Sequence, residues 1–185
     1  MKAPKIVKDL MVPLEDYATV SQSATLYEAV IALEETHVRS HHHRYPHRAV
    51  LVLDDSGNTV GKLSQWDLIK ALEPRYREMT DSKSLSRFGL SRDYIRSMVK
   101  SRGLWQKPLD NLAEKASNIR VKEVMYTPAE GEYVEETASL DEGIHQLIMG
   151  HHQSLLVASG SKVVGILRLI DVFFVICGMI KASRE

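Results

Sequence analysis

The stretch RSHHHRYPHR, residues 39–48, is the densest group of side chains in the sequence that could do chemistry. It holds four histidines and three arginines, and the apolar run AVLVL follows it directly. Neutral imidazoles bind transition metals, whereas guanidinium groups and protonated imidazoles bind anions. Histidine also titrates near neutral pH. The residue types alone therefore allow a metal site, an anion site, a pH-sensitive loop or a solvated loop.

A metal site in this stretch is limited by geometry. Consecutive side chains of an extended segment point to opposite sides, so His41, His42 and His43 cannot all reach one ion. One of them could supply two ligands together with His37 or His47, and a dimer partner could complete the set. No cysteine or acidic residue lies inside the stretch. We therefore keep His41, His43 and His47 as metal candidates and favour a cationic surface loop.

A second pattern, GKLSQWD at residues 61–67, places a hydroxyl three positions before a carboxylate at the expected start of a helix. A carboxylate can accept hydrogen bonds from two adjacent hydroxyls, and the start of a helix favours an anion. Ser64 and Asp67 are equally suited to cap the helix, which stabilises it by about 1 kcal/mol without any ligand. The two roles can coexist.

The composition is that of a globular protein: 44% of the 185 residues are hydrophobic and 26% are charged. Acidic and basic residues balance at 24 each, so net charge does not indicate a nucleic-acid partner. The single cysteine, Cys177, excludes an internal disulfide and fits a reducing compartment. We find no signal peptide, and the apolar segment at 167–180 is shorter than the roughly 20 residues that span a bilayer. We expect a soluble, cytoplasmic protein.

An internal repeat organises the chain, because three segments recur in the same order. The matched pairs are VKDLMVP with VKEVMYTP, SATLYEAV with TASLDEGI, and VLVLDDSGNTVGKLSQWDLI with LLVASGSKVVGILRLIDVF. Each copy predicts a short strand, a helix, a strand hairpin and a second helix, in the order β-α-β-β-α. In the first copy Ser23 or Thr25 caps the first helix, and the strands span 49–53 and 59–63. One such unit would be marginal alone, so we expect the two copies to pack together.

These motifs resemble the cystathionine-beta-synthase (CBS) domain, and two copies in tandem resemble the Bateman module. The resemblance covers roughly residues 5–73 and 119–183. It implies an α/β (α+β) fold in which two β-α-β-β-α repeats pack as a pseudo-twofold pair. We expect CBS domain 1 at 1–73, a basic helical insert at 74–118, and CBS domain 2 at 119–185.

Paired CBS domains bind adenine nucleotides in the clefts between them and act as energy or ligand sensors. The resemblance implies that Asp67 accepts hydrogen bonds from both ribose hydroxyls and that Ser64 donates to a phosphate. His47 and Arg48 stand just before the middle strand, where such residues face phosphates in nucleotide-sensing members of the family. Phosphate binding is the role that we expect for both.

The second copy departs from this pattern, because it reads GILRLID and has Arg168 in place of the hydroxyl. Asp171 keeps the ribose role available. Arg168 could reach a phosphate directly, or it could pair with Asp171 and close the site. The basic pair of the first copy corresponds to His151 and His152, of which His152 is the expected nucleotide contact.

The positions around the adenine ring are carried over from the resemblance. They are Thr19, Val20 and Ala49 in the first copy, and Thr127, Tyr133 and Val134 in the second. The valines could equally be ordinary core residues.

The insert is cationic, with nine Lys or Arg against three Asp or Glu between 75 and 107. SRDYIRSMVKSR predicts a helix capped by Ser91, and LDNLAEKASNI predicts another. The insert could be a helical hairpin packed on the module, a partner-docking element, or a nucleic-acid patch. The low aromatic content and the lack of a nucleic-acid module argue against the last.

The sequence thus predicts a regulatory module, not an enzyme, that binds AMP, ADP or ATP and signals to a separate, unidentified partner by rearrangement. S-adenosylmethionine or NAD could occupy the same cleft. We expect a homodimer, with the apolar C-terminal helix VFFVICGMI as its interface. A metal-responsive histidine-rich module and a structural docking unit without ligand are the alternatives.

Overall fold

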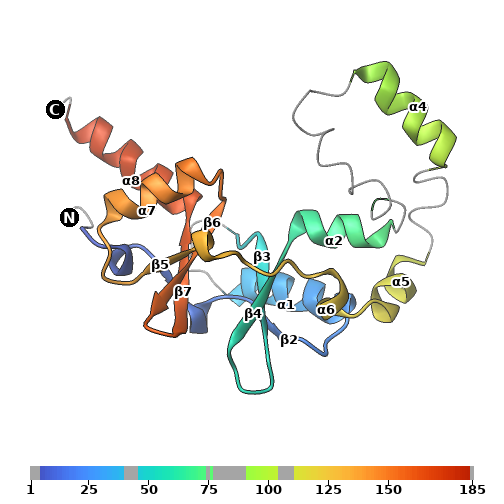
Figure 1. Ribbon diagram of the computed structural model, residues 1–185, viewed down its shortest axis with the longest axis horizontal. Helices are drawn as coiled ribbons and strands as arrows, with labels where there is room; N and C mark the ends of the chain where they lie inside the picture. The colour runs from blue at the N-terminus through green and yellow to red at the C-terminus, as the bar shows by residue number, and fades with distance from the viewer. Residues whose placement is uncertain (1–4, 40–45, 74–75, 77–90, 104–110, 184–185) are drawn as a thin grey trace.

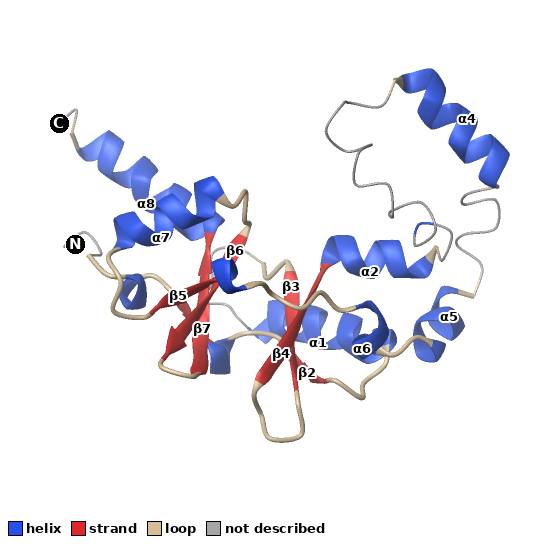
Figure 2. Ribbon diagram, in the orientation of Figure 1, coloured by secondary structure: helices blue, strands red, loops and turns tan. Residues whose placement is uncertain are grey.

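The computed structural model describes residues 5–39, 46–73, 76, 91–103 and 111–183. This part of the chain is a mixed α+β structure with two small sheets and helices around them (Figures 1 and 2). The first sheet has three strands in the order β2-β3-β4. The second sheet has four strands in the order β1-β7-β6-β5. The predicted fold class is confirmed.

Each copy forms its elements in the predicted order. The first contains β2 (Thr19–Ser21), α1 (Leu26–Arg39), β3 (Ala49–Leu53), β4 (Thr59–Ser64) and α2 (Gln65–Leu72). The second contains β5 (Tyr133–Glu135), α7 (Leu140–Met149), β6 (Ser154–Ser159), β7 (Lys162–Arg168) and α8 (Leu169–Ala182). In both sheets the first strand of the repeat runs parallel to the second, and the second and third form an antiparallel hairpin.

The helix starts follow from local side-chain chemistry. Thr25, rather than Ser23, precedes α1: its hydroxyl accepts from the Glu28 backbone N–H at 3.2 Å, and the Glu28 carboxylate accepts from the Thr25 N–H at 2.6 Å. Ser139 caps α7 by accepting from the Glu142 N–H at 3.2 Å. These bonds satisfy N–H groups that have no partner inside the helix.

The segment that leads into each copy packs on the other copy. Before the first repeat, η1 (Val7–Asp9), β1 (Val12–Pro13) and η2 (Leu14–Asp16) lie against the second sheet, where β1 pairs antiparallel with β7. Before the second repeat, α6 (Val121–Val124) packs against α2 and β4 of the first. A short helix, η4 (Glu130–Glu132), then leads into β5. We call this arrangement the exchange of leading segments.

The exchange of leading segments joins the two hydrophobic cores. Val7 is fully buried in the core of the second copy, and Val121 is fully buried in the core of the first. A third cluster, which includes Leu51 of β3 and Leu156 of β6, lies between the sheets. Separating the copies would expose all three clusters, so the described domain pair behaves as one folding unit. The predicted boundaries at 73 and 119 remain predictions.

Two equivalent glycines make room for the exchanged segments. A Cβ on Gly165 of β7 would lie 2.6 Å from the backbone oxygen of Val12 in β1. A Cβ on Gly61 of β4 would lie 2.4 Å from the Met125 sulfur, which follows α6. The first obstacle is backbone, whereas the second is the flexible end of a side chain.

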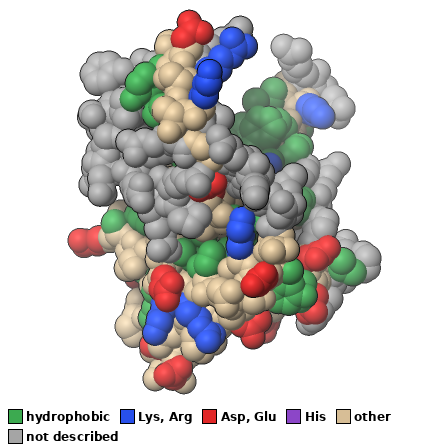
Figure 3. Space-filling model, turned by 90° about the vertical axis from the view of Figure 1, so that its right-hand side faces the viewer, with side chains coloured by type: hydrophobic (Ala, Val, Ile, Leu, Met, Phe, Trp, Pro, Cys, Tyr) green, Lys and Arg blue, Asp and Glu red, His purple; other side chains and the backbone are tan. Residues whose placement is uncertain are grey.

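The insert contains the two predicted helices. α4 (Arg92–Arg102) begins where the Ser91 hydroxyl accepts from the Tyr94 N–H at 3.2 Å, and α5 (Leu112–Asn118) packs against α1 and α2. α4 lies at the far end from both termini (Figure 1), and a small group of Lys and Arg side chains lies at the top of the face shown in Figure 3. None of the helices in the described residues is long and apolar enough to cross a membrane.

The two glycines predict unequal costs for the same substitution. Gly165→Ala should lower the free energy of unfolding by about 1–3 kcal/mol, because β1 must shift away from β7. Gly61→Ala should cost less than about 1 kcal/mol, because Met125 can rotate and the unfolded chain loses conformational freedom. Urea denaturation of the two variants measures the difference. Equal costs would contradict the close approach of β1 to Gly165.

Candidate functional site

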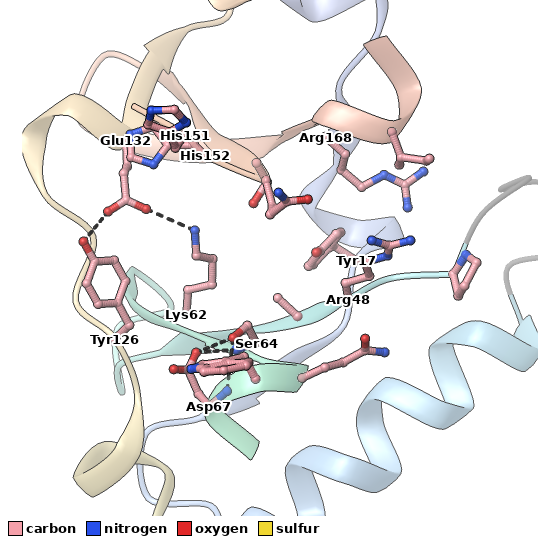
Figure 4. A pocket seen from close by; sticks show the side chains of 17 residues that line it. Tyr17, Arg48, Lys62, Ser64, Asp67, Tyr126, Glu132, His151, His152 and Arg168 are labelled. Atoms are coloured by element: carbon pink, nitrogen blue, oxygen red, sulfur yellow. Dashed lines mark hydrogen bonds and ion pairs between the residues drawn. The ribbon is translucent and has the colours of Figure 1, made fainter. Parts of the chain in front are cut away.

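A cleft of about 480 Å³ opens between the two copies (Figure 4). Its lining comes from β3, β4 and α2 of the first copy, from β6, β7 and α8 of the second, and from the segment around Tyr126 and Glu132. Cavities of roughly 300–1,000 Å³ accommodate small-molecule ligands.

Ser64 and Asp67 lie on one wall of the cleft and form a complete capping box at the start of α2. Asp67 Oδ2 accepts from the Ser64 backbone N–H at 2.9 Å and from the Ser64 hydroxyl at 2.5 Å. The Ser64 oxygen in turn accepts from the Asp67 N–H at 3.2 Å. Asp67 Oδ1 has no hydrogen bond with any residue that the structure describes. The cap is therefore formed, and one carboxylate oxygen is still available.

Basic side chains stand at both ends of the cleft. In Figure 4, Arg48 and Arg168 lie at one end, and Lys62, His151 and His152 lie at the other. Two carboxylates, those of Asp67 and Glu132, line the cleft as well, so its positive charge is partly balanced.

Lys62, Glu132 and Tyr126 form a hydrogen-bonded group that joins the two copies. The Lys62 ammonium lies 3.1 Å from Glu132 Oε2, and the Tyr126 hydroxyl donates to Glu132 Oε1 at 2.5 Å. Lys62 and Tyr126 also exchange backbone hydrogen bonds of 2.8 and 2.9 Å. Burial alone would raise the pKa of Glu132, but the hydrogen bonds from Tyr126 and Lys62 outweigh it and lower that pKa. The hydrogen bond to Glu132, followed by burial, raises the pKa of Tyr126.

Arg168 and Asp171 form a bidentate pair at the start of α8. Arg168 Nε donates to Asp171 Oδ2 at 2.5 Å, and Arg168 Nη2 donates to Oδ1 at 2.8 Å. Both carboxylate oxygens are thus engaged, and the Arg168 residue is only 5% exposed. The sequence allowed Arg168 either to reach a phosphate or to pair with Asp171, and in the structure it pairs with Asp171.

The backbone conformation at Gly150 and His151 places the side chains of His151 and His152 in the cleft lining. His151 has a φ of 52°, in the left-handed region where a residue with a side chain costs about 1 kcal/mol. The His152 ring lies over Gly150, where a Cβ would come within 2.0 Å of its Nε2. Gly150 is therefore required for this position of the His152 ring.

Residues 7–74 match the family model of the CBS domain. The second copy repeats the same elements around its own sheet, so the match and the fold agree. Residues 7–74 thus carry the CBS domain, and residues 133–182 repeat its strands and helices in the same order. No curated protein sequence matches it.

Solved CBS-pair structures have the same fold over nearly the whole chain. CBSX2 of Arabidopsis thaliana has 20% sequence identity and a TM-score of 0.58, covering 98% of this chain and 99% of its own. Its complex with AMP has 20% identity and a TM-score of 0.59, covering 94% and 97%. The CBS domain of a membrane protein from Sphaerobacter thermophilus has 17% identity and a TM-score of 0.61, covering 94% and 88%.

The two copies bring six of the predicted nucleotide contacts together in the cleft between them. They are Arg48, Ala49, Ser64, Asp67, His152 and Arg168. Asp171 does not line the cleft, because Arg168 lies over its carboxylate.

His47 is placed differently from the prediction. It is 2% exposed and does not line the cleft. Tyr17 does line the cleft, and its ring meets the His47 ring edge-on with centroids 4.3 Å apart. Burial raises the pKa of Tyr17 to about 12, so its phenol stays protonated.

The predicted adenine positions, apart from Ala49, lie outside the cleft lining. Thr19 and Val20 pair with β3, and Val134 is buried in the core of the second copy. Tyr133 packs against the cluster between the sheets, and Thr127 is exposed next to Tyr126. Val20 and Val134 could have been ordinary core residues, and in the structure both pack with the hydrophobic cores.

Sequence reasoning missed Tyr17, Lys62, Trp66, Tyr126 and Glu132 as cleft residues. Lys62 and Trp66 stand inside the GKLSQWD pattern and could have been included. Tyr126 and Glu132 reach the first copy only through the exchange of leading segments, which no local pattern signals.

The structure describes only part of the predicted metal candidates. Within the described residues, no three His, Cys, Asp or Glu side chains converge as metal ligands. His41 and His43 lie outside the described residues.

The Lys62–Glu132–Tyr126 group predicts a pH-dependent loss of stability. Because the folded pKa of Glu132 lies below its ordinary value of 4.5, its carboxylate stabilises the fold above pH 4.5. That contribution disappears as the pH falls through the folded pKa. Glu132→Gln should cost about 1–3 kcal/mol at pH 7, because Glu132 is buried and the change weakens its bonds to Lys62 and Tyr126.

Thermal unfolding between pH 7 and pH 3 tests this expectation. The difference in melting temperature between Glu132→Gln and the unaltered protein should shrink below pH 4.5. Glu136→Gln is the control, since Glu136 pairs at 2.6 Å with the exposed Lys8 and should lose much less stability. A difference for Glu132→Gln that stays constant across this range would contradict the account.

Proposed function

We propose that this CBS pair is a regulatory module, without catalytic activity of its own, that binds an adenine nucleotide in the cleft between its copies. The observation that carries the proposal is the available oxygen of Asp67 in a cleft lined by basic side chains. A sugar diol needs a carboxylate acceptor, and a phosphate needs cationic or N–H donors within reach of the same molecule. The AMP complex of CBSX2, which has the same fold, supports this ligand class.

The ribose is assigned to Asp67 and the phosphate to its cationic surroundings. Asp67 Oδ2 already accepts two hydrogen bonds from Ser64, so Oδ1, with its two lone-pair sites, accepts from both hydroxyls of the ribose. The guanidinium of Arg48 offers planar paired donors to a phosphate, and the start of α2 adds its dipole. His152 lines the same cleft and can donate a hydrogen bond from its ring.

The signal is a shift between arrangements of the two copies. The cleft is lined by both copies, so a bound nucleotide favours whichever arrangement lets it touch both walls. The Lys62–Glu132 ion pair also spans the copies, and a phosphate competes with Glu132 for Lys62. Nucleotide binding thereby changes the strength of one connection between the copies, which a separate partner protein reads.

Asp67→Asn tests the proposal while it preserves the size of the side chain. The variant should bind AMP at least about 10-fold more weakly, since hydrogen bonds to a charged group each contribute about 1.5–3 kcal/mol. The stabilisation of the melting temperature by AMP should fall accordingly. Asp55→Asn, in the exposed β3–β4 turn, is the matched control and should bind as the unaltered protein does.

An unchanged AMP response in folded Asp67→Asn would contradict the assignment of the ribose. A panel of ADP, ATP, S-adenosylmethionine and NAD in the same assay selects among ligands. The absence of any response across the panel would favour a structural docking unit instead.

We also propose that two chains form a homodimer through the apolar patch on α7 and α8. The exposed members of this patch are Ile148, Met149, Phe173, Ile176, Met179 and Ile180. On α8 they recur at helical spacing along one face, and a continuous apolar face of this kind marks an association surface. A twofold axis would place the patch against its own copy.

Phe173→Glu should convert the dimer into a monomer, because each interface would bury two uncompensated carboxylates. Light scattering behind size-exclusion chromatography measures the mass. Ser161→Glu, in the exposed β6–β7 hairpin, introduces the same charge away from the patch and should remain dimeric. A Phe173→Glu protein with unchanged dimeric mass would exclude this interface.

A further inference from the structure

The two halves of the cleft are built from the same repeat but present different chemistry. We infer that each chain binds a single nucleotide, in the half that contains Asp67, and that Arg168 closes the other half. The Asp67 half consists of Arg48, Lys62, Ser64 and Asp67. The corresponding positions of the second copy, called the Asp171 half, are Gln153, Ile166, Arg168 and Asp171, of which Gln153 and Arg168 line the cleft. The inference rests on the proposed function and adds the number and location of the ligand sites.

Strand register fixes which residues correspond. Ala49 pairs with Ser64 in the first hairpin, and Ser154 pairs with Arg168 in the second. The Gln65 N–H donates to the Arg48 carbonyl at 3.0 Å, and the Leu169 N–H donates to the Gln153 carbonyl at 3.0 Å. Arg48 therefore corresponds to Gln153, and His47 to His152. The sequence comparison, which matched this pair to His151 and His152, was wrong by one position.

The Asp67 half has its ligand groups exposed to the cleft. Arg48, Lys62, Ser64 and Asp67 all line it, and the only partner of Asp67 among the described residues is Ser64, on a single carboxylate oxygen. A short hydroxyl at position 64 leaves space in front of the carboxylate. This half keeps one acceptor oxygen and two cations around the same space, of which Lys62 also pairs with Glu132.

The Asp171 half is closed at the corresponding position. Arg168 replaces the small hydroxyl, and its guanidinium donates to both oxygens of Asp171. A ribose would have to displace this guanidinium and separate two charges that are largely buried, which is unfavourable. The side chain that occupies the hydroxyl position therefore blocks the diol acceptor beside it.

The Asp171 half also lacks the cations of the first. Gln153 replaces Arg48 and is neutral. By register, Ile166 replaces Lys62, and it is fully buried against the core between the sheets. Val12, which pairs with Ile166, takes the place of Tyr126 and is 3% exposed. Where the first half has Lys62 and Tyr126 at these two positions, the second has packed apolar side chains, so a nucleotide bound there would lack this cation.

Isothermal titration calorimetry with AMP, ADP and ATP counts the sites directly. We expect one equivalent per chain for the tightest nucleotide, and at least a 10-fold loss of affinity in Asp67→Asn. Two equivalents in the unaltered protein would overturn the single-site inference and leave the proposed function intact. One equivalent that survives Asp67→Asn would place the ligand elsewhere and overturn it as well. No binding of any of the three would overturn the proposed function itself.

Arg168→Ser restores the hydroxyl pattern and frees Asp171. Circular dichroism confirms that the variant is folded. We expect a second, weaker equivalent of nucleotide, which disappears again in the Arg168→Ser, Asp171→Asn double variant. A folded Arg168→Ser protein that still binds one equivalent would overturn the role of Arg168 in closing this half.

Discussion

The exchange of leading segments is the constraint on which the rest of the molecule depends. Each repeat lacks part of its packing until the segment before the other repeat lies across it. Val7 and Val121, both fully buried, carry this exchange in opposite directions. Gly61 and Gly165 permit it, because any side chain there would meet the crossing segment. The two copies are consequently fixed next to each other, and the cleft between them has two firm walls.

The same constraint creates the polar wall of the cleft. The segment that crosses onto β4 carries Tyr126, and the short helix that follows carries Glu132. Their bonds to Lys62 tie a strand of the first copy to the approach of the second. A group of this kind is well placed to respond to a ligand, because its lysine faces the cleft and its carboxylate belongs to the other copy. The proposed signalling mechanism uses this connection.

Much of the fold could be predicted from the sequence because its signals are local. Repeated apolar spacing, the Thr25 and Ser139 caps and the turn between β3 and β4 each reflect interactions within a few residues. The Ser64–Asp67 pair belongs to the same class, since three residues at a helix start determine its geometry. The exchange of leading segments is not local, so the sequence could not reveal that Tyr126 and Glu132 reach Lys62.

The remaining differences have equally physical causes. His47 was expected to face the cleft, but it is buried beneath Tyr17. The second-copy match was one position early, because the hairpin from Ala49 to Ser64 contains one residue more than the hairpin from Ser154 to Arg168. For Arg168 the sequence offered two outcomes, and only the positions of its donors and of both Asp171 oxygens could choose between them.

The most direct test of the central claim is a crystal structure grown with saturating adenine nucleotide. We expect one nucleotide per chain in the cleft, with both ribose hydroxyls hydrogen-bonded to Asp67 and the phosphates beside Arg48. The Arg168–Asp171 pair should remain intact in the same crystal. A cleft filled by the protein's own side chains, or a nucleotide whose ribose lies away from Asp67, would contradict it.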